Sequence, residues 1–393
     1  MPTCSRRRFL HGSLAAIATL ATFPLAGRDD DIEPIRPSLH ALAELAPQRT
    51  GNLSGEGFPI TSFADLALAR TFVNAEATSA DLKDALPHLD TIIPSVLTWE
   101  LAPRGWTGLF GIDPEEIDAA LAQPVGNDTL HLLKGRFDVA AVKARWMENG
   151  YGETEDGSRV WTFPGTDDAW NAMLDRVGLT SSLARASRTL ALPYDDVVAF
   201  GDANVLARTV AVTRKDDKDM TYDGPPRRFV RTDIEGVGEA VMIPAKVMFA
   251  PGITIPASSP TNQRTDATAI PEDVARSWVR GAMMATTPGA PYALESPMPL
   301  PSDPATYVVV VDLTDDADAQ TYLNQTVSQF EQQQSVVWKE PLSTFLDLQS
   351  AEVEPIGTVR LTFRQRGEKR YDLIDMLNAY DLSFLAYPGN GSP

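Results

Sequence analysis

The chain has 393 residues, with 53 acidic and 34 basic side chains, so its formal net charge at pH 7 is −19. Hydrophobic residues make up 43% of the chain and charged residues 22%, as in ordinary globular proteins. This composition argues against wholesale disorder and against a protein that crosses a membrane many times. A surface this negative repels a phosphate backbone, so nucleic-acid binding is not expected. The length allows two domains.

Cysteine and histidine usage narrows the chemistry further. The single cysteine, Cys4, excludes a disulfide within the chain, a redox pair and a cysteine-bound zinc site. The histidines, His11, His40, His88 and His131, are too widely spaced in sequence to predict a shared metal site. We therefore expect a body that needs no cofactor and no metal, and that is stabilised by burial of apolar side chains.

The amino terminus carries the clearest motif. Residues 5–10 read Ser-Arg-Arg-Arg-Phe-Leu, and an uncharged, mostly apolar run follows over residues 13–26. That run is too short for a comfortable transmembrane helix, which needs about 20 residues. The motif resembles the twin-arginine export signal of prokaryotes, and the resemblance covers residues 1–26. It implies a protein that folds in the cytoplasm and is carried by the twin-arginine export machinery to the periplasm, the cell envelope or the medium.

Whether the leader is cleaved stays open at this stage. An Ala-x-Ala pattern at residues 16–18 lies too early in the run, and a later one is replaced by Pro-Leu-Ala at residues 24–26. No cysteine follows the run, so a lipoprotein anchor is not expected. A retained leader would act as a weak membrane tether.

The body begins with a polar spacer over residues 27–58, which holds one short helical patch at Leu39, Leu42 and Leu45. Residues 59–213 then read as a first α+β unit. Asp113 and Asp138 are expected to cap helices, and residues 205–212 fit either a strand or a helix. The pattern of this unit predicts helices over 61–74, 79–86, from 114 onward and over 139–149, and strands over 99–101, 109–110, 129–137, 160–163 and 189–200.

Residues 214–305 read as an irregular, proline-rich connecting region, with an extended stretch over 236–256 and one helix over 271–285. Residues 306–393 form a second α+β unit. Four consecutive valines over 308–311 predict a central strand that is buried on both faces. The same unit is expected to contain a helix from Asp315 or Asp316 to Gln334, a strand over 353–364 and a last helix over 371–379.

The predicted fold class is therefore α+β, with two strand-helix-strand units joined by a proline-rich middle. Segments 128–163 and 306–364 share one order: a strand, an acidic cap, a helix and a returning strand. Two explanations stay open for this likeness. It reflects a distant internal duplication, or it reflects capping chemistry that recurs in most α+β proteins.

No catalytic motif is found: the nucleophile elbow, the phosphate loop and the zinc-binding helix are all missing from the sequence. Asp195, Asp196 and Asp202 lie close in sequence and fit either an acid–base pair or exposed loop acids. Five tryptophans in the first unit fit either a ligand groove or a packed core: Trp99, Trp106, Trp146, Trp161 and Trp170.

These observations predict an exported, non-enzymatic protein that binds a ligand or a protein partner. The alternative is a cofactor-free hydrolase that uses carboxylates, and a purely structural module is a third hypothesis. A cleft that contains Asp195, Asp196 or Asp202 would favour the hydrolase. A broad apolar groove without titratable pairs would favour binding.

Overall fold

The computed structural model divides the chain into two compact units, Met1–Arg36 and Pro37–Pro393. The structure describes residues 38–46, 61–73, 105–125, 128–154, 159–177, 187–213, 238–244, 278–287, 306–314, 317–335, 338–354, 357–366, 376 and 381–385, all within the second unit. The leader, Trp99 and the elements expected over 79–86, 99–101 and most of 371–379 lie outside these residues. The expected divisions after residues 213 and 305 fall within the second compact unit.

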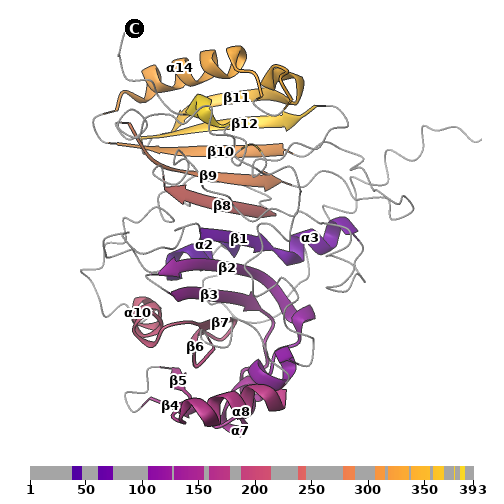
Figure 1. Ribbon diagram of the computed structural model, residues 1–393, viewed down its shortest axis with the longest axis vertical. Coiled ribbons are helices and arrows are strands. Elements are labelled where there is room, and N and C mark those ends of the chain that lie inside the picture. Colours follow the sequence, from indigo (N-terminus) through magenta and orange to yellow (C-terminus); the bar gives the residue numbers. More distant parts are fainter. Residues whose placement is uncertain are drawn as a thin grey trace, which may run out of the picture. The chain divides into compact units, whose positions relative to one another are not determined.

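Twelve strands form a single sheet, and every pairing in it is antiparallel (Figure 1). The strand order is β11-β12-β10-β9-β8-β1-β2-β3-β7-β6-β5-β4. The strands are β1 (Thr61–Asp65), β2 (Ile117–Val125), β3 (Asp128–Gly135), β4 (Gly152–Glu153), β5 (Val160–Thr162), β6 (Thr189–Tyr194), β7 (Val197–Phe200), β8 (Glu239–Pro244), β9 (Val279–Thr287), β10 (Thr306–Leu313), β11 (Leu346–Glu354) and β12 (Thr358–Gln365).

Helices cover both faces of this sheet. They are α2 (Ser38–Leu45), α3 (Leu66–Val73), α7 (Val139–Glu148), α8 (Asp167–Val177), α10 (Ala203–Thr213) and α14 (Ala319–Gln332), with a π-helical turn η2 (Trp106–Phe110) and 3-10 turns η3 (Pro114–Glu116), η5 (Leu342–Thr344) and η6 (Ser383–Leu385). The protein thus has the mixed helix and strand content that the sequence predicts, although one antiparallel sheet dominates it. None of the helices that the structure describes is long and apolar enough to cross a membrane.

The strand order is similar on the two sides of the β1–β8 pair, which lies in the middle of the sheet (Figure 1). In the first half, residues 61–213, the hairpin β2–β3 is followed by α7, and β3 pairs with β7 of a second hairpin, β6–β7. In the second half, residues 239–365, the hairpin β9–β10 is followed by α14, and β10 pairs with β12 of the hairpin β11–β12. The strands β4 and β5 extend only the first half.

The connecting region contributes two of the central strands. The extended stretch predicted around Val241 and Ile243 is confirmed as β8. The helix predicted over 271–285 is wrong from residue 279 onward, because these residues form β9. The strand β9 pairs with β8 on one side and with β10 on the other. Its residues are buried on both faces of the sheet. Pairing across the sheet therefore overrides the helical spacing of its apolar residues.

Three elements of the first half also differ from the prediction. Residues 61–65 form β1, and the helix begins only at Leu66, where the Oδ1 atom of Asp65 accepts a hydrogen bond from the amide of Leu68 at 2.7 Å. Asp113 does cap a turn, but that turn ends at Glu116 and the expected helix is the strand β2. Residues 109–110 belong to the π-helical turn η2 instead of a strand.

Helices α7 and α14 each begin after a capping aspartate. The Oδ1 atom of Asp138 accepts hydrogen bonds from the first amides of α7, and that of Asp318 does the same for α14. The cap of α7 is confirmed, whereas the cap predicted for α14, Asp315 or Asp316, is wrong, because the helix begins after Asp318. Hydrogen bonds from the Thr321 amide and hydroxyl and the Gln320 amide hold the pKa of Asp318 below its ordinary value.

The returning strands are only partly as predicted. The strand over 160–163 is confirmed as β5, but it pairs with β6, and the strand that returns to β3 is β7. The single strands predicted over 189–200 and 353–364 are each interrupted by a turn and belong to hairpins. Residues 205–212 are helical, within α10.

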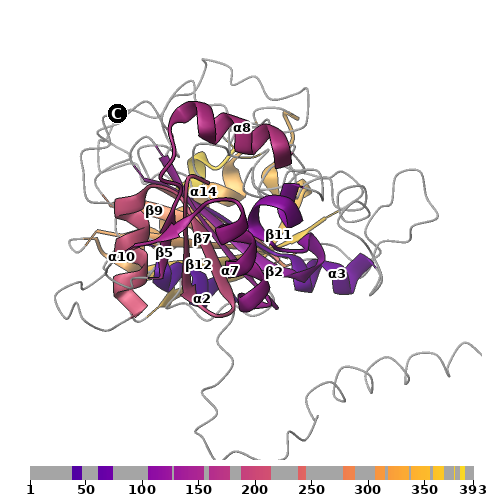
Figure 2. The same cartoon turned by 90° about the horizontal axis from the view of Figure 1, so that it is seen from below.

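The sheet has two faces, which we name by the helices that pack on them (Figure 2). On the α2 face, one cluster of apolar side chains joins the two halves and includes residues of α2, α10 and the central strands. On the α7 face, the first half has a cluster with Trp146 and Phe200, and the second half has another with Val309 and Phe363. Val309 on the α7 face and Val310 on the α2 face are both fully buried, which confirms the two-sided burial predicted for β10.

Candidate functional site

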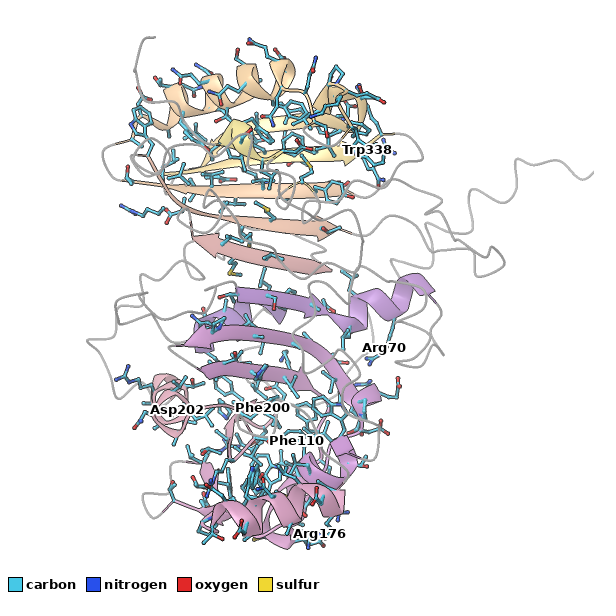
Figure 3. All side chains as sticks on the ribbon, viewed as in Figure 1. Arg70, Phe110, Arg176, Phe200, Asp202 and Trp338 are labelled. Carbon is cyan, nitrogen blue, oxygen red and sulfur yellow. The ribbon has the colours of Figure 1, made fainter. Side chains whose placement is uncertain are left out.

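The acidic residues singled out in the sequence do not converge. Asp195 and Asp196 form the exposed turn between β6 and β7, where Asp195 pairs with Arg159 and Asp196 pairs with Lys134. Asp202 lies at the start of α10, and its Oδ1 atom accepts hydrogen bonds from the backbone amides of residues 204 and 205 at 2.8 and 3.3 Å (Figure 3). Each carboxylate therefore has its own structural partner, and the three do not form an acid–base pair.

The tryptophans of the first half fill the core. Among those the structure describes, Trp106, Trp146, Trp161 and Trp170 are at most 6% exposed. The indole of Trp146 contacts that of Trp161 with ring centroids 5.1 Å apart, and its Nε1 atom donates to the Phe110 carbonyl at 3.0 Å. These rings stabilise the packing of α7 and α8 on the sheet and present no groove for a ligand.

Arg70 is a half-buried charged residue, and its contacts give it a structural role (Figure 3). Its guanidinium donates to the carbonyls of Ile117 and Pro114 at 2.9 and 3.3 Å, and burial lowers its pKa. Arg70 thus holds α3 against the turn that leads into β2. Within the described ranges, no three histidine, cysteine or acidic side chains lie close enough to hold a metal ion together.

His131, on β3, breaks the apolar pattern of the α7 face. Because side chains alternate along a strand, it shares this face with Leu133. Its imidazole is 3% exposed and stacks on Phe200 of β7, with ring centroids 4.7 Å apart and 17° between the ring planes. The rings of Phe200 and Phe110 are 5.1 Å apart and continue this aromatic contact toward η2 (Figure 3).

The Nδ1 atom of His131 is buried and has no hydrogen-bond partner among the residues that the structure describes. Burial lowers the pKa of His131 to about 3, so the ring stays neutral at physiological pH. A buried ring nitrogen without a partner costs about 1–3 kcal/mol of stability. A ligand that hydrogen-bonds to Nδ1 would remove this cost.

Four small side chains continue the α7 face from His131 toward the middle of the sheet: Ser62, Ala64, Ala120 and Ala122. We call them the small-residue floor. Ala122 is the Cα partner of both His131 and Ser62, and Ala64 is the partner of Ala120. Ser62 is half-buried although it belongs to a central strand, so solvent reaches one end of the floor.

Larger side chains border the small-residue floor on both sides. Phe200 and Leu133 lie beyond it in the first half. Val241 and Met284 continue the same row across β8 and β9. The floor is therefore a strip of short side chains on a sheet face that otherwise carries large apolar ones.

Comparison with known proteins gives no template for this arrangement. The chain matches no protein-family model, no curated protein and no solved structure. The function must therefore be inferred from the chemistry of the site itself.

The arrangement around His131 suits binding better than catalysis. The only hydroxyl of the small-residue floor, on Ser62, is two strands away from His131, a backbone separation of about 10 Å. The His131 ring also stacks toward Phe200, on the side opposite Ser62. A proton transfer needs the two groups within about 3 Å, so this serine and this histidine do not make a nucleophile–base pair.

The sequence analysis missed His131 as a site residue, although one signal was present. His131 is the only polar residue in the run Leu130-His131-Leu132-Leu133. His131 lies seven residues before Asp138, the cap of α7. In the second half, the residue seven positions before the cap Asp318 is Val311, which also lies on the α7 face. The strand before the helix therefore does not require a histidine at this position.

Proposed function

We propose that the protein is an exported, non-enzymatic binding protein that holds a small molecule beside His131. The observation that carries the proposal is the buried Nδ1 atom of His131, which has no hydrogen-bond partner in the described part of the chain. Ser62 lies in the same row of side chains on this face and is half-buried, which supports a ligand that enters from that side. The separate ion pairs of Asp195 and Asp196 speak against the carboxylate hydrolase.

We expect His131→Phe to lose a bound small molecule that the wild-type protein carries. Phenylalanine fills a similar volume and preserves the stacking on Phe200, but it offers no hydrogen-bonding atom. The measurement is native mass spectrometry of the full chain, purified without denaturation from its producing cells. Wild type should show an added mass of a few hundred daltons, as expected for small ligands of this kind of site.

The matched control is His131→Asn, because the asparagine side chain keeps a polar atom near the position of Nδ1. It should retain most of the added mass, and His131→Phe should retain almost none. The proposal fails if wild type carries no added mass, or if His131→Phe carries the same mass as wild type.

Export is the second part of the proposal, and the basic motif at residues 5–10 supports it. Replacing Arg6, Arg7 and Arg8 together with lysine should leave most of the protein in the cytoplasm, because an arginine pair is what the export machinery recognises. The measurement is the fraction of protein found outside the cytoplasm. Arg28→Lys, a conservative change outside the motif, should be exported normally. Undiminished export of the triple variant would exclude the twin-arginine route.

We also propose that the two halves of the sheet arose by duplication. The shared order of strands and the caps Asp138 and Asp318 support this origin. The second half has no counterpart of His131, since Val311 occupies the corresponding place, so the ligand site belongs to the first half. An experimental structure in which residues 117–200 and 279–365 cannot be superposed strand for strand would contradict the duplication.

A further inference from the structure

We infer that residues 350–354 of β11 form a docking edge for an extended peptide whose side chains alternate between apolar and basic. We call these residues the acidic edge. The inference goes beyond the small-molecule site, because it concerns a protein partner and the other half of the sheet. It follows from three properties of the acidic edge: its unpaired backbone, its exposure to solvent and its alternating side chains.

The acidic edge lies at one end of the sheet. In the part of the chain that the structure describes, β11 pairs with β12 on one side and is the last strand on the other (Figure 1). At the opposite end of the sheet, β4 has only two residues, whereas β11 has nine. Among the described residues, no backbone hydrogen bond reaches the outer side of residues 350–353. An edge of this length offers a row of backbone donors and acceptors to an added strand.

The turn after β11 shows which backbone groups face outward. The amide of Gly357 donates to the carbonyl of Glu354 at 3.1 Å, so the Glu354 backbone faces the β12 side. Along an antiparallel strand, residues that bond to the neighbouring strand alternate with residues that do not. The register between residues 350–354 and β12 is regular, so this alternation holds throughout the acidic edge. The N–H and C=O groups of Ala351 and Val353 therefore face away from β12.

Exposure to solvent increases along β11 toward the acidic edge. Helix α14 packs on the α7 face near the beginning of the strand, where the rings of Phe330 and Phe363 are 5.1 Å apart. Leu348, the Cα partner of Phe363, is half-buried. Val353 is 39% exposed, although its partner on β12, Val359, is fully buried. The acidic edge is therefore the solvent-accessible part of β11.

The side chains of the acidic edge differ between the two faces of the sheet. Ala351 lies on the α7 face, beside the apolar cluster of the second half, and Val353 follows it on the same face. Glu352 and Glu354 alternate with them and lie on the α2 face. A strand that continues the sheet must therefore place an apolar side chain beside Val353 and a hydrophilic one beside Glu352.

The charges of the α2 face favour a basic partner. Arg360 of β12 is the Cα partner of Glu352 and lies 3.8 Å from the carboxylate of Glu354. A second copy of the acidic edge, added as an antiparallel strand, would bring its glutamates beside these two, and like charges on neighbouring strands are destabilising. Lysine or arginine on the added strand would instead be attracted to the glutamates. Basic, acidic and basic side chains would then follow one another across three strands.

Three fluorescein-labelled peptides of equal length test this partner class. One alternates valine and lysine, one alternates valine and glutamate, and the third has the valines and lysines of the first in separate blocks. Binding to the full chain is measured by fluorescence anisotropy. The alternating valine–lysine peptide should bind tighter than either other peptide by about tenfold or more, the ratio expected from one or two net backbone hydrogen bonds. The block peptide measures the general attraction of a basic peptide to a chain of net charge −19.

Two substitutions of Val353 test the backbone pairing. Val353→Pro removes an outward N–H group and leaves the bonds to β12 in place, and proline is tolerated on an edge strand in this orientation. It should weaken the binding of the alternating valine–lysine peptide by about tenfold or more. Val353→Thr is the matched control, because it keeps the N–H group and the branched side chain, and it should bind as wild type does.

Glu352→Gln tests the charge without altering the backbone. It should weaken the binding of the alternating valine–lysine peptide by about threefold, as expected for one exposed ion pair. Hydrogen–deuterium exchange locates the peptide: exchange over residues 350–354 of wild type should become slower with the alternating valine–lysine peptide and should not change with the block peptide.

Equal binding of the alternating valine–lysine peptide and the block peptide would overturn the inference. So would a Val353→Pro variant that has the circular dichroism spectrum of wild type and also its affinity. If Val353→Pro does not fold, the exchange experiment decides, and unchanged exchange over residues 350–354 overturns the inference. Sedimentation of wild type and Val353→Pro tests the other occupant, because a wild-type dimer that the substitution converts to a monomer would mean that a second copy occupies the edge.

Discussion

Replacing Val309 with aspartate should abolish the soluble, folded protein, and Val310→Asp should reduce it severely. Val309 is fully buried on the α7 face, where its Cα partners are Met284 and Leu361. Val310 is fully buried on the opposite face, within the cluster that joins the two halves. Burying a carboxylate costs several kcal/mol even after local relaxation, and a protein of this kind is stable by only about 5–15 kcal/mol.

The two substitutions should not be equal. Arg360 is the Cα partner of Val310 on β12, so an aspartate at 310 has a cation beside it that offsets part of the cost. No such cation faces Val309 from β9 or β12, because its partners there are apolar. Val309→Asp is therefore the stricter test of the core.

The edge strand offers a matched control for these substitutions. Val353 lies on β11, at one end of the strand order, and is 39% exposed. Val353→Asp should leave the yield of soluble protein close to that of wild type. The measurements are the soluble fraction after expression and the urea unfolding curve followed by circular dichroism. Normal solubility of Val309→Asp would contradict the core described here, and normal solubility of Val310→Asp would show that the α2 face of β10 is open to solvent.

The sequence predicts the elements whose signals are local. The valine run of β10 needs no knowledge of its neighbours, because apolar residues at successive positions require burial on both faces. Asp138 predicts the start of α7, since a carboxylate there satisfies free amides of the first turn. Val142 and Trp146 of α7 are buried as expected, but Met147 is 62% exposed, because it lies one residue beyond the buried stripe.

Local signals fail where pairing across the sheet decides the structure. The strand β2 is rich in alanine, which favours helices, but it pairs with β3 along its length and with β1 over residues 119–122. The strand β9 is fixed in the same way by β8 and β10. One partner of each strand, β1 for β2 and β8 for β9, is separated from it by a long stretch of sequence, so a window of local residues carries no information about that pairing.

The candidate site could not be predicted from the sequence either, because pairing between strands brings its residues together. Ser62, Ala122 and His131 come from three different strands, and only the register of those strands places them in one row. An alanine or a serine alone predicts nothing about a ligand. The sequence contributes only the lone polar residue between Leu130 and Leu132, and its burial and missing hydrogen bond require the folded structure.

The free energy of unfolding should fall as the pH decreases from about 6.5 to about 3, and His131→Phe should remove the part due to this histidine. Burial lowers the pKa of His131 from its ordinary value of 6.5 to about 3 in the folded protein. Between these two values the unfolded chain binds a proton that the folded protein does not bind. The contribution of the neutral ring is therefore complete above pH 6.5 and is lost progressively toward pH 3.

The expected size of this effect is large. One proton gives a slope of about 1.4 kcal/mol per pH unit, so the contribution of His131 approaches about 5 kcal/mol over the whole window. Carboxylates also titrate in the lower part of the window, but they are common to wild type and variant. The difference between the two proteins therefore isolates His131, as long as the substitution leaves the other groups in place.

The measurement is urea unfolding of wild type, freed of any co-purified molecule by refolding, and of His131→Phe treated in the same way, at pH 7.5, 6, 5 and 4, followed by tryptophan fluorescence. At pH 7.5 the variant should be at least as stable as wild type. Phenylalanine leaves no polar atom unpaired at this position, so the variant should gain up to about 1–3 kcal/mol in the free energy of unfolding. Its advantage should grow as the pH falls. An advantage that does not change with pH would mean that His131 is protonated normally in the folded protein. A variant much less stable than wild type at pH 7.5 would mean that the imidazole makes a stabilising hydrogen bond, and His131 would then be a structural residue instead of a ligand contact.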